Sequence, residues 1–84
     1  MSEASGIVEL VRGIVEPLVD DVEALDVSST VAEDGTELVE IRVADEDAGK
    51  VIGRQGRVIK SIRVLARAAA CGTGGNVEVE IVED

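Results

Sequence analysis

The sequence contains no Phe, Tyr, Trp or His, and it has a single cysteine. Without aromatic rings, the chain cannot bind nucleic acid by stacking bases on aromatic platforms. Without histidine, it lacks the commonest general base and the commonest zinc ligand. The lone Cys71 cannot form an internal disulfide, so the fold needs no oxidising compartment.

Long apolar runs are also missing from the sequence. The first six residues have no basic region and no leucine-rich run follows them, so we expect no signal peptide. No apolar stretch approaches the ~20 residues that span a bilayer, so we expect a cytoplasmic protein with no membrane partner. At 84 residues with 45% hydrophobic side chains, we expect one small domain over residues 1–84 with an aliphatic core.

Positive charge is scarce overall but concentrated in one segment. The chain has 18 acids against 8 bases, a formal net charge of −10, which by itself argues against nucleic acid or anionic membranes as partners. Residues 48–77, however, contain no acid, and their bases are Lys50, Arg54, Arg57, Lys60, Arg63 and Arg67. This distribution predicts either one electropositive patch on an acidic body or a solvated helix face.

Apolar periodicity predicts the elements of the first half of the chain. A helix is expected over residues 4–16, capped by Ser2 or Ser5 and ended by Pro17. Its apolar stripe consists of Ile7, Leu10, Val11, Ile14 and Leu18. Two strands with alternating apolar residues follow at 25–31 and 38–43, joined by an Asp-Gly hairpin turn at 34–35. The inward positions of the first strand are Leu25, Val27, Ser29 and Val31.

The second half is predicted to contain two helices and a strand. A short helix is expected at 46–52, with Asp45, Glu46 and Asp47 capping its start and favouring its positive end. A longer helix is expected at 57–71, with an inner face of Ile59, Ile62, Leu65, Ala66 and Ala69. The last strand is expected at 77–82, after a glycine-rich turn. The predicted fold is α+β, of order α-β-β-α-α-β, with three helices on one face of a three-stranded mixed sheet.

Two G-x-x-G spacings occur, Gly53–Gly56 and Gly72–Gly75. The second lies in a neutral turn before a strand, where a helix stop and loop explain it. The first lies between two predicted helices and within the basic segment. Glycines there leave no side chain between the loop backbone and an approaching phosphate chain, and the next helix presents unpaired amides. Arg54 and Gln55 are expected to project from the loop, with Lys50 one turn before it and Arg57, Lys60 and Arg67 exposed after it.

Residues 49–63, GKVIGRQGRVIKSIR, resemble the VIGxxGxxI signature of KH domains, and the element order resembles the type II arrangement. The match extends over about residues 7–82 to the small single-domain KH proteins of bacteria, the KhpA family. This resemblance implies a non-catalytic single-stranded RNA-binding protein of the RNA chaperone or post-transcriptional regulator type. In KH domains, the GXXG loop clamps the backbone of about four nucleotides. The residues implied for RNA binding are Lys50, Gly53, Arg54, Gln55, Gly56, Arg57 and Lys60.

The resemblance also implies a groove floor and protein partners. Val51, Ile52, Val58 and Ile59 are candidates for an aliphatic floor beneath the bases, with core packing expected for at least two of them. A homodimer is implied, as is a complex with a larger RNA-binding partner of the KhpB (Jag, EloR) family. Val64, off the inner stripe of its helix, is a candidate interface residue or a partly covered surface residue.

One other function competes with RNA binding, and a second is not expected. A KH fold used mainly for dimerisation and scaffolding is the alternative, favoured by the net charge. An enzyme is not expected, because no histidine is present to activate a serine or threonine and no cofactor motif occurs. No catalytic residue, cofactor or metal is predicted, and the acidic groups at 20–21 and 45–47 are expected to cap helices or solubilise turns.

Overall fold

Three strands form the sheet onto which the rest of the protein packs. The computed structural model describes residues 6–71 and 75–82. Its elements are α1 (Gly6–Val15), the short 3-10 helices η1 (Glu16–Leu18) and η2 (Val22–Ala24), β1 (Asp26–Val31), β2 (Glu37–Arg42), α2 (Asp45–Ile52), η3 (Arg54–Gly56), α3 (Arg57–Cys71) and β3 (Val77–Val82). This order confirms the predicted succession of helices and strands. The predicted N-caps Ser2 and Ser5, and residues 72–74 of the predicted glycine-rich turn at 72–76, lie outside the described residues.

The sheet is mixed, with strand order β1-β2-β3. β1 and β2 run antiparallel, with Val27 opposite Ile41. The hairpin turn between them closes with the amide of Ala32 donating to the carbonyl oxygen of Thr36 at 2.8 Å, and Gly35 adopts the positive φ of 92° that the turn requires. β3 returns through the crossover that carries α2 and α3, and it pairs parallel to β2. The predicted mixed sheet is therefore confirmed.

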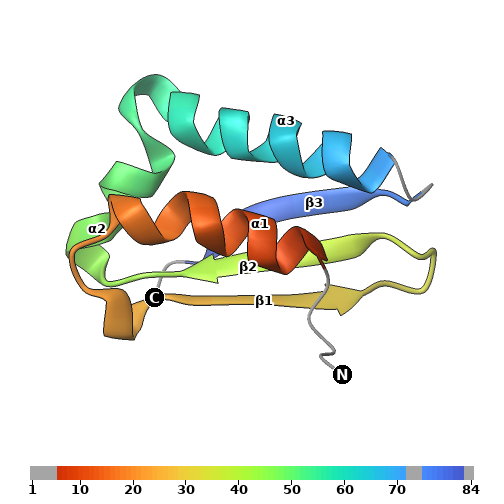
Figure 1. Cartoon of the computed structure of the whole chain (residues 1–84), viewed down its shortest axis with the longest axis horizontal. Helices are drawn as coiled ribbons and strands as arrows, with labels where there is room; N and C mark the ends of the chain where they lie inside the picture. Colours follow the sequence, from red (N-terminus) through yellow and green to blue (C-terminus); the bar gives the residue numbers. More distant parts are fainter. Residues whose placement is uncertain (1–5, 72–74, 83–84) are drawn as a thin grey trace.

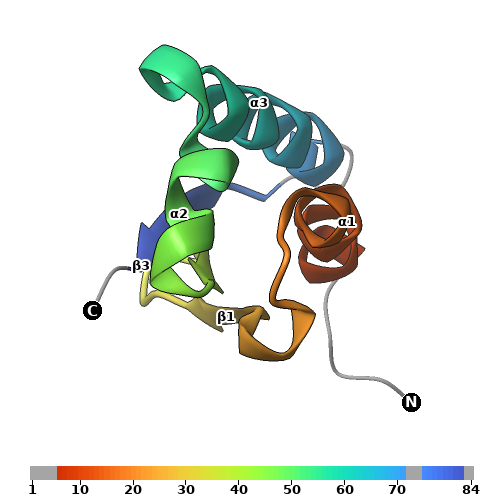
Figure 2. The ribbon, with the colours of Figure 1, turned by 90° about the vertical axis from the view of Figure 1, so that its left-hand side faces the viewer.

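The helices cover one face of this sheet. α1 packs against β1 and α3 packs against β3, and the two helices contact each other across that face (Figure 1). α2 closes one end of the layer, where it contacts α3 and η1 (Figure 2). The core between these layers is entirely aliphatic. Its buried members are Ile7, Val8, Val11, Val15, Val19, Val27, Val39, Ile41, Val51, Ile59, Ile62, Ala66, Ala70, Val77 and Val79.

The buried face of α3 differs from the predicted one. Leu65 is 49% exposed and Ala69 is exposed, whereas Ala70 takes the last core position. The helix turns this face inward because it packs against β3 on one side and α1 on the other. The consequence is that a leucine placed in the core by sequence lies on the surface beside α1.

The buried faces of α1 and β1 also differ from the predicted ones. In α1, Val8 and Val15 are buried, while Leu10 and Ile14 of the predicted stripe are only half-buried. In β1, Val27 is buried but Val31, at the end of the strand beside the hairpin turn, is 70% exposed. Both shifts leave apolar side chains partly or fully at the surface, and Ile14 of α1 lies beside α3.

Candidate nucleic-acid interface

The segment between α2 and α3 is a glycine turn with unusual backbone angles. Gly53 has φ 80° and ψ 170°, Gln55 has φ 59° and ψ 23°, and Gly56 has φ 75°. The amide of Gly53 donates to the carbonyl oxygen of Gly49 at 2.8 Å, and this hydrogen bond is the last of α2. The amide of Gly56 donates to the carbonyl oxygen of Gly53 at 3.1 Å. Positive φ at three of four residues reverses the chain tightly, and two of those positions are filled by the residue that tolerates it.

This turn stands out from the body of the molecule. It projects beyond the α2 and α3 helices at one end of the fold (Figures 1 and 2). Arg54 and Gln55 are exposed and the two glycines are half-exposed. Arg57 donates from Nη2 to Oε1 of Gln55 at 3.1 Å, which places a guanidinium at the first turn of α3. Amides at the start of a helix together with these cations form a site suited to phosphate oxygens.

A shallow hollow of about 320 Å³ adjoins the turn, between α3 and β3. Its lining residues are Ile52, Ile59, Arg63, Glu80 and Ile81. Three isoleucines provide an aliphatic floor, and a guanidinium and a carboxylate provide polar edges. Arg63 is fixed there, because its Nε donates to the carbonyl oxygen of Val79 at 3.0 Å. The hollow can therefore hold a flat apolar group with hydrogen-bonding edges.

The four predicted floor residues divide between core and hollow. Val51 is fully buried, and Ile59 is 7% exposed and lines the hollow from the core side. Ile52 and Val58 are half-buried, and Ile52 alone of these two lines the hollow. Val58 instead faces α1.

Sequence reasoning missed three residues of this hollow, Arg63, Glu80 and Ile81. Arg63 follows Ile59 by four residues, so a helix places both on one side, which is a signal present in the sequence. Ile81 was identifiable only as an inward-facing strand residue. Ile81 lies near α3 because β3 is an edge strand that packs beside that helix. The sequence does not specify this placement of β3.

The cations of the basic segment remain together in the structure. Arg54, Arg57, Lys60 and Arg67 are all exposed, and they extend from the turn along α3. On the strands, the exposed acids are Asp26, Glu78 and Glu80, and Glu80 is paired in register with the half-buried Glu40. α3 therefore carries positive charge with no acid of its own.

Lys50, predicted to lie beside phosphates, is held by two carboxylates. Its Nζ donates to Oδ1 of Asp47 at 3.1 Å and to Oδ2 of Asp20. The hydrogen bond to Asp20, followed by that to Asp47, raises the pKa of Lys50. Its charge lies one turn before the glycine turn, as predicted, but much of that charge is compensated within the protein.

Asp47 has a structural role that differs from the predicted cap. The N-cap residue of α2 is Ala44, and no side chain among the described residues caps that end. The Asp47 carboxylate is fully buried and accepts hydrogen bonds from the amides of Asp20 at 3.2 Å and Asp21 at 3.0 Å. The bond from the Asp21 amide is the main reason that the pKa of Asp47 lies below its ordinary value. Asp47 thereby ties α2 to the connection between η1 and η2.

A second surface, on the opposite side of α3, is apolar. A hollow of about 340 Å³ between α1 and α3 includes Ile14, Leu18, Val58 and Leu65 in its lining. Val64, on the outer side of α3, is 63% exposed, which agrees with its predicted position off the inner stripe. Over the part of the chain that the structure describes, no group of three or more Cys, Asp or Glu side chains is placed to hold a metal ion. Across the same residues, no helix has the length and apolar character needed to cross a bilayer.

Comparison with known families identifies the arrangement. The model of the KhpA/KhpB KH domain matches residues 8–81. The chain belongs to this family. RNA-binding protein KhpA of Caldanaerobacter subterraneus subsp. tengcongensis is 43% identical over 74 residues, covering 88% of this chain and 97% of the relative. RNA-binding protein KhpA of Borreliella burgdorferi is 37% identical over 83 residues, covering 99% of this chain and all of the relative.

Solved structures share the fold. Era in complex with MgGDPNP and nucleotides 1506–1542 of 16S ribosomal RNA matches with a TM-score of 0.61 and 21% identity. The match covers 89% of this chain and 28% of that chain. A variant of Aquifex aeolicus Era bound to GDP and AlF4− matches with a TM-score of 0.60 at 21% identity, over 89% of this chain and 29% of that one. This chain is therefore similar in fold to about a quarter of Era.

Proposed function

We propose that this protein is a non-catalytic single-stranded RNA-binding protein of the RNA chaperone or post-transcriptional regulator type. The observation that carries the proposal is the glycine turn at 53–56, which projects from the fold beside an aliphatic hollow. The names of the KhpA relatives support the same function. Such a function would place the protein in the cytoplasm, where bacterial transcripts occur.

In the proposed complex, the turn holds the sugar–phosphate chain. Gly53 and Gly56 allow a phosphate to approach the backbone, and Arg54, Arg57 and Lys60 neutralise its charge. Gln55 contributes an amide at the tip of the turn and also positions Arg57. Lys50 contributes less direct contact, because Asp20 and Asp47 already bind its ammonium group.

The bases would occupy the hollow beside the turn. Ile52, Ile59 and Ile81 offer an apolar surface, which suits a binder whose sequence has no aromatic side chain. Arg63 and Glu80 lie at its edges and can hydrogen-bond to base edges. The acidic remainder of the chain would repel RNA from other faces and so restrict it to the basic segment.

Replacing Arg54 and Gln55 with aspartates tests this site. The variant Arg54→Asp/Gln55→Asp places two carboxylates where phosphates would lie, and both side chains are exposed, so the fold should be retained. A matched control is Arg12→Asp/Ser28→Asp, which changes net charge equally at two exposed positions on α1 and β1. Binding to short unstructured RNA is measured by fluorescence anisotropy over a range of salt concentrations.

The clamp variant should lose at least about tenfold in affinity, since it removes a charge-assisted contact and adds repulsion. The control should stay close to the parent. The parent's log affinity should fall with log salt by about 0.7 per phosphate contacted. Equal binding by the clamp variant and the parent would disprove the role of the turn and favour the scaffolding function instead.

We also propose that the protein forms a homodimer through the apolar surface of α1 and α3. The family resemblance implies self-association. Leu65 on this surface and Val64 on the adjoining outer side of α3 are large apolar side chains that are exposed. The surface lies on the side of α3 opposite the hollow that would hold RNA. The same resemblance implies a complex with a KhpB-like protein. Light scattering of Leu65→Glu should show a monomer while the parent is a dimer, and a dimeric variant would contradict this assignment.

A further inference from the structure

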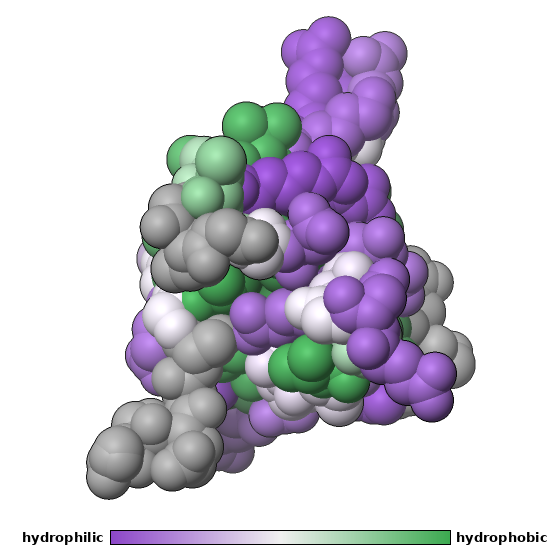
Figure 3. All heavy atoms as spheres, turned by 90° about the vertical axis from the view of Figure 1, so that its right-hand side faces the viewer, coloured by the Kyte–Doolittle hydropathy of each residue, from purple (hydrophilic) through white to green (hydrophobic). Residues whose placement is uncertain are grey.

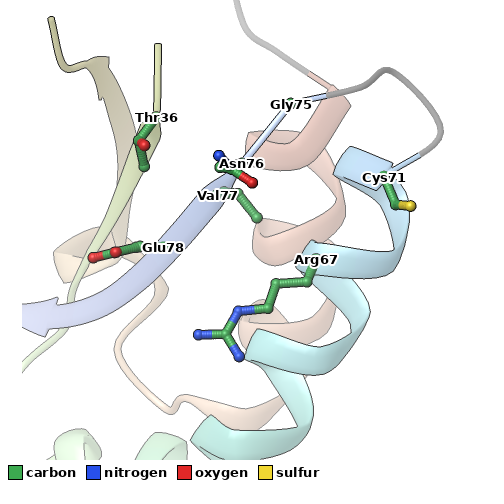
Figure 4. A pocket seen from close by; sticks show the side chains of 7 residues that line it. All are labelled: Thr36, Arg67, Cys71, Gly75, Asn76, Val77 and Glu78. Atoms are coloured by element: carbon green, nitrogen blue, oxygen red, sulfur yellow. The ribbon is translucent and has the colours of Figure 1, made fainter. Parts of the chain in front are cut away.

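A third pocket lies at the far end of α3 from the glycine turn. It has a volume of about 550 Å³, within the range of small-ligand sites. Its lining residues are Thr36, Arg67, Cys71, Gly75, Asn76, Val77 and Glu78 (Figure 4). Figure 3 faces this end of the molecule and shows hydrophilic residues over much of it. No feature of the proposed clamp uses this pocket.

The pocket and the hollow at the turn lie along one seam between α3 and β3. Arg63 lines the hollow, and Arg67, one turn later on the same side of α3, lines the pocket. On the strand, Ile81 lines the hollow and Glu78 lines the pocket. α3 runs away from the turn while β3 runs back toward it, so successive residues of each element border successive parts of the seam.

The polar groups of the pocket suit one nucleotide. Arg67 is exposed and has no hydrogen-bond or ion-pair partner within residues 6–71 and 75–82, so its guanidinium is available for a phosphate. In Figure 4 its side chain extends from α3 toward β3. The Thr36 hydroxyl and the Asn76 amide lie on the strand side, whereas the Glu78 side chain points away from Arg67 (Figure 4). Hydroxyl and amide groups both donate and accept hydrogen bonds, so Thr36 and Asn76 can bond to a base edge.

We propose that this pocket is a second nucleotide subsite for a longer RNA strand. An RNA held at the glycine turn continues along the seam between α3 and β3 and places a further nucleotide in the pocket, with a phosphate at Arg67. This inference rests on the RNA-binding function proposed above. The Cα positions of Arg57 and Arg67 are about 15 Å apart along the helix, so the second subsite lies beyond the first contacts of the clamp.

Cys71 makes the subsite testable, because it is the only cysteine of the chain, is exposed and lines the pocket. RNAs of about ten nucleotides carry one base linked to a thiopyridyl disulfide, placed at each position in turn. The Cys71 thiolate attacks this disulfide, releases thiopyridone and leaves the RNA cross-linked to the protein. Cross-linking should peak at positions near one end of the RNA and fall elsewhere. Cys71→Ser should abolish it.

Arg67→Gln tests the proposed phosphate contact. It should weaken binding of the ten-nucleotide RNA by about five- to tenfold and reduce the salt slope by about 0.7. It should leave a four-nucleotide RNA within about twofold of the parent, because a distant exposed charge is screened. Arg12→Gln, which removes an exposed arginine from α1, is the matched control and should change neither RNA. Reaction with a small neutral disulfide should be equal in the parent and Arg67→Gln, which excludes a change in thiol reactivity.

Three results would overturn the subsite. The first is cross-linking that does not depend on the position of the activated base in the RNA. The second is an effect of Arg67→Gln on binding of the ten-nucleotide RNA equal to that of Arg12→Gln. The third is labelling of Cys71 by a single activated nucleotide as efficient as labelling by the ten-nucleotide RNA. If one of these results is found but RNA binding still requires Arg54 and Gln55, the RNA-binding function of the glycine turn is supported and only the second subsite is disproved. If the clamp variant binds RNA as the parent does, the RNA-binding proposal fails and the subsite fails with it.

Discussion

A Cβ atom on Gly53 would lie 2.4 Å from Cγ2 of Val58 and 2.8 Å from the backbone nitrogen of the same residue. Val58, which faces α1 from the first turn of α3, therefore packs directly against Gly53. Since backbone cannot move aside as a flexible side chain can, this position has room for glycine alone. The approach is also what keeps the turn tight between the two helices.

A glycine series follows from this contact. Gly53→Ala should lower the free energy of unfolding by about 1–3 kcal/mol, because it adds both a clash and positive-φ strain. Gly56→Ala, at φ 75° but with nothing within 4 Å of the added atom, should cost about 1 kcal/mol from strain alone. Gly49→Ala, inside α2 and in open space, should raise stability by up to about 1 kcal/mol. Urea unfolding measures all three, and equal effects at Gly53 and Gly49 would contradict the contact.

The backbone of Gln55 gives a second prediction. A non-glycine residue at φ 59° is in the left-handed region, which costs about 1–2 kcal/mol. Gln55→Gly should therefore raise the free energy of unfolding by about 0.5–1 kcal/mol after the added chain entropy of glycine. Gln55→Val should lower it, because β-branched residues rarely adopt this conformation. Denaturant midpoints that rank valine above glycine would rule out the strained turn.

The buried carboxylate of Asp47 predicts a pH dependence. Its pKa is lowered in the folded protein, so its contribution to stability is present above the unfolded pKa of about 3.9 and is lost as pH falls through the folded pKa. Asp47→Asn should lower the melting temperature by several degrees at pH 7, and the difference from the parent should narrow below about pH 4. Asp45→Asn, exposed in the same turn of α2, is the control and should melt close to the parent. A difference that is constant from pH 7 to pH 3 would show that Asp47 does not act through its charge.

The ion pair between Asp20 and Lys50 predicts a gain in affinity. The Asp20 side chain is 84% exposed, so removing its charge should cost little stability. Asp20→Asn leaves the Lys50 ammonium paired with Asp47 alone and removes a negative charge near the glycine turn, so RNA should bind about two- to fivefold more tightly at low salt. Glu9→Gln changes net charge equally on the exposed side of α1 and should have a smaller effect. Isothermal titration calorimetry with a short RNA would compare the affinities of the Asp20→Asn and Glu9→Gln variants. Weaker binding by Asp20→Asn would contradict the idea that Asp20 competes with RNA phosphate for Lys50.

Much of the fold was predictable because two periodicities in the sequence are clean. The alternation at Val39 and Ile41, and again at Val77 and Val79, matches strands whose inward residues are buried. The glycine turn was predictable for a different reason, since two glycines three residues apart interrupt otherwise helical sequence. These signals are local, and each needs only a few neighbouring residues.

What sequence reasoning missed depends on contacts between distant elements. Leu65 fits an inner helical stripe by spacing, but the angle at which α3 rests between α1 and β3 decides that Ala70 is buried instead. Asp47 fits a helix cap by position, yet it accepts amide hydrogen bonds from residues 26 and 27 positions earlier. Arg63 fits a phosphate contact by charge, yet part of its guanidinium is bound to Val79. No local pattern encodes these pairings.

The hydrogen bond from Arg63 to the Val79 carbonyl oxygen also protects the edge of the sheet against pairing with another strand. β3 is an edge strand, and an unpaired row of carbonyl and amide groups on such a strand invites another chain to add to it. The guanidinium occupies one of these acceptors and places bulk and charge across the approach. Copies of this protein are thereby discouraged from joining sheet to sheet into open-ended polymers.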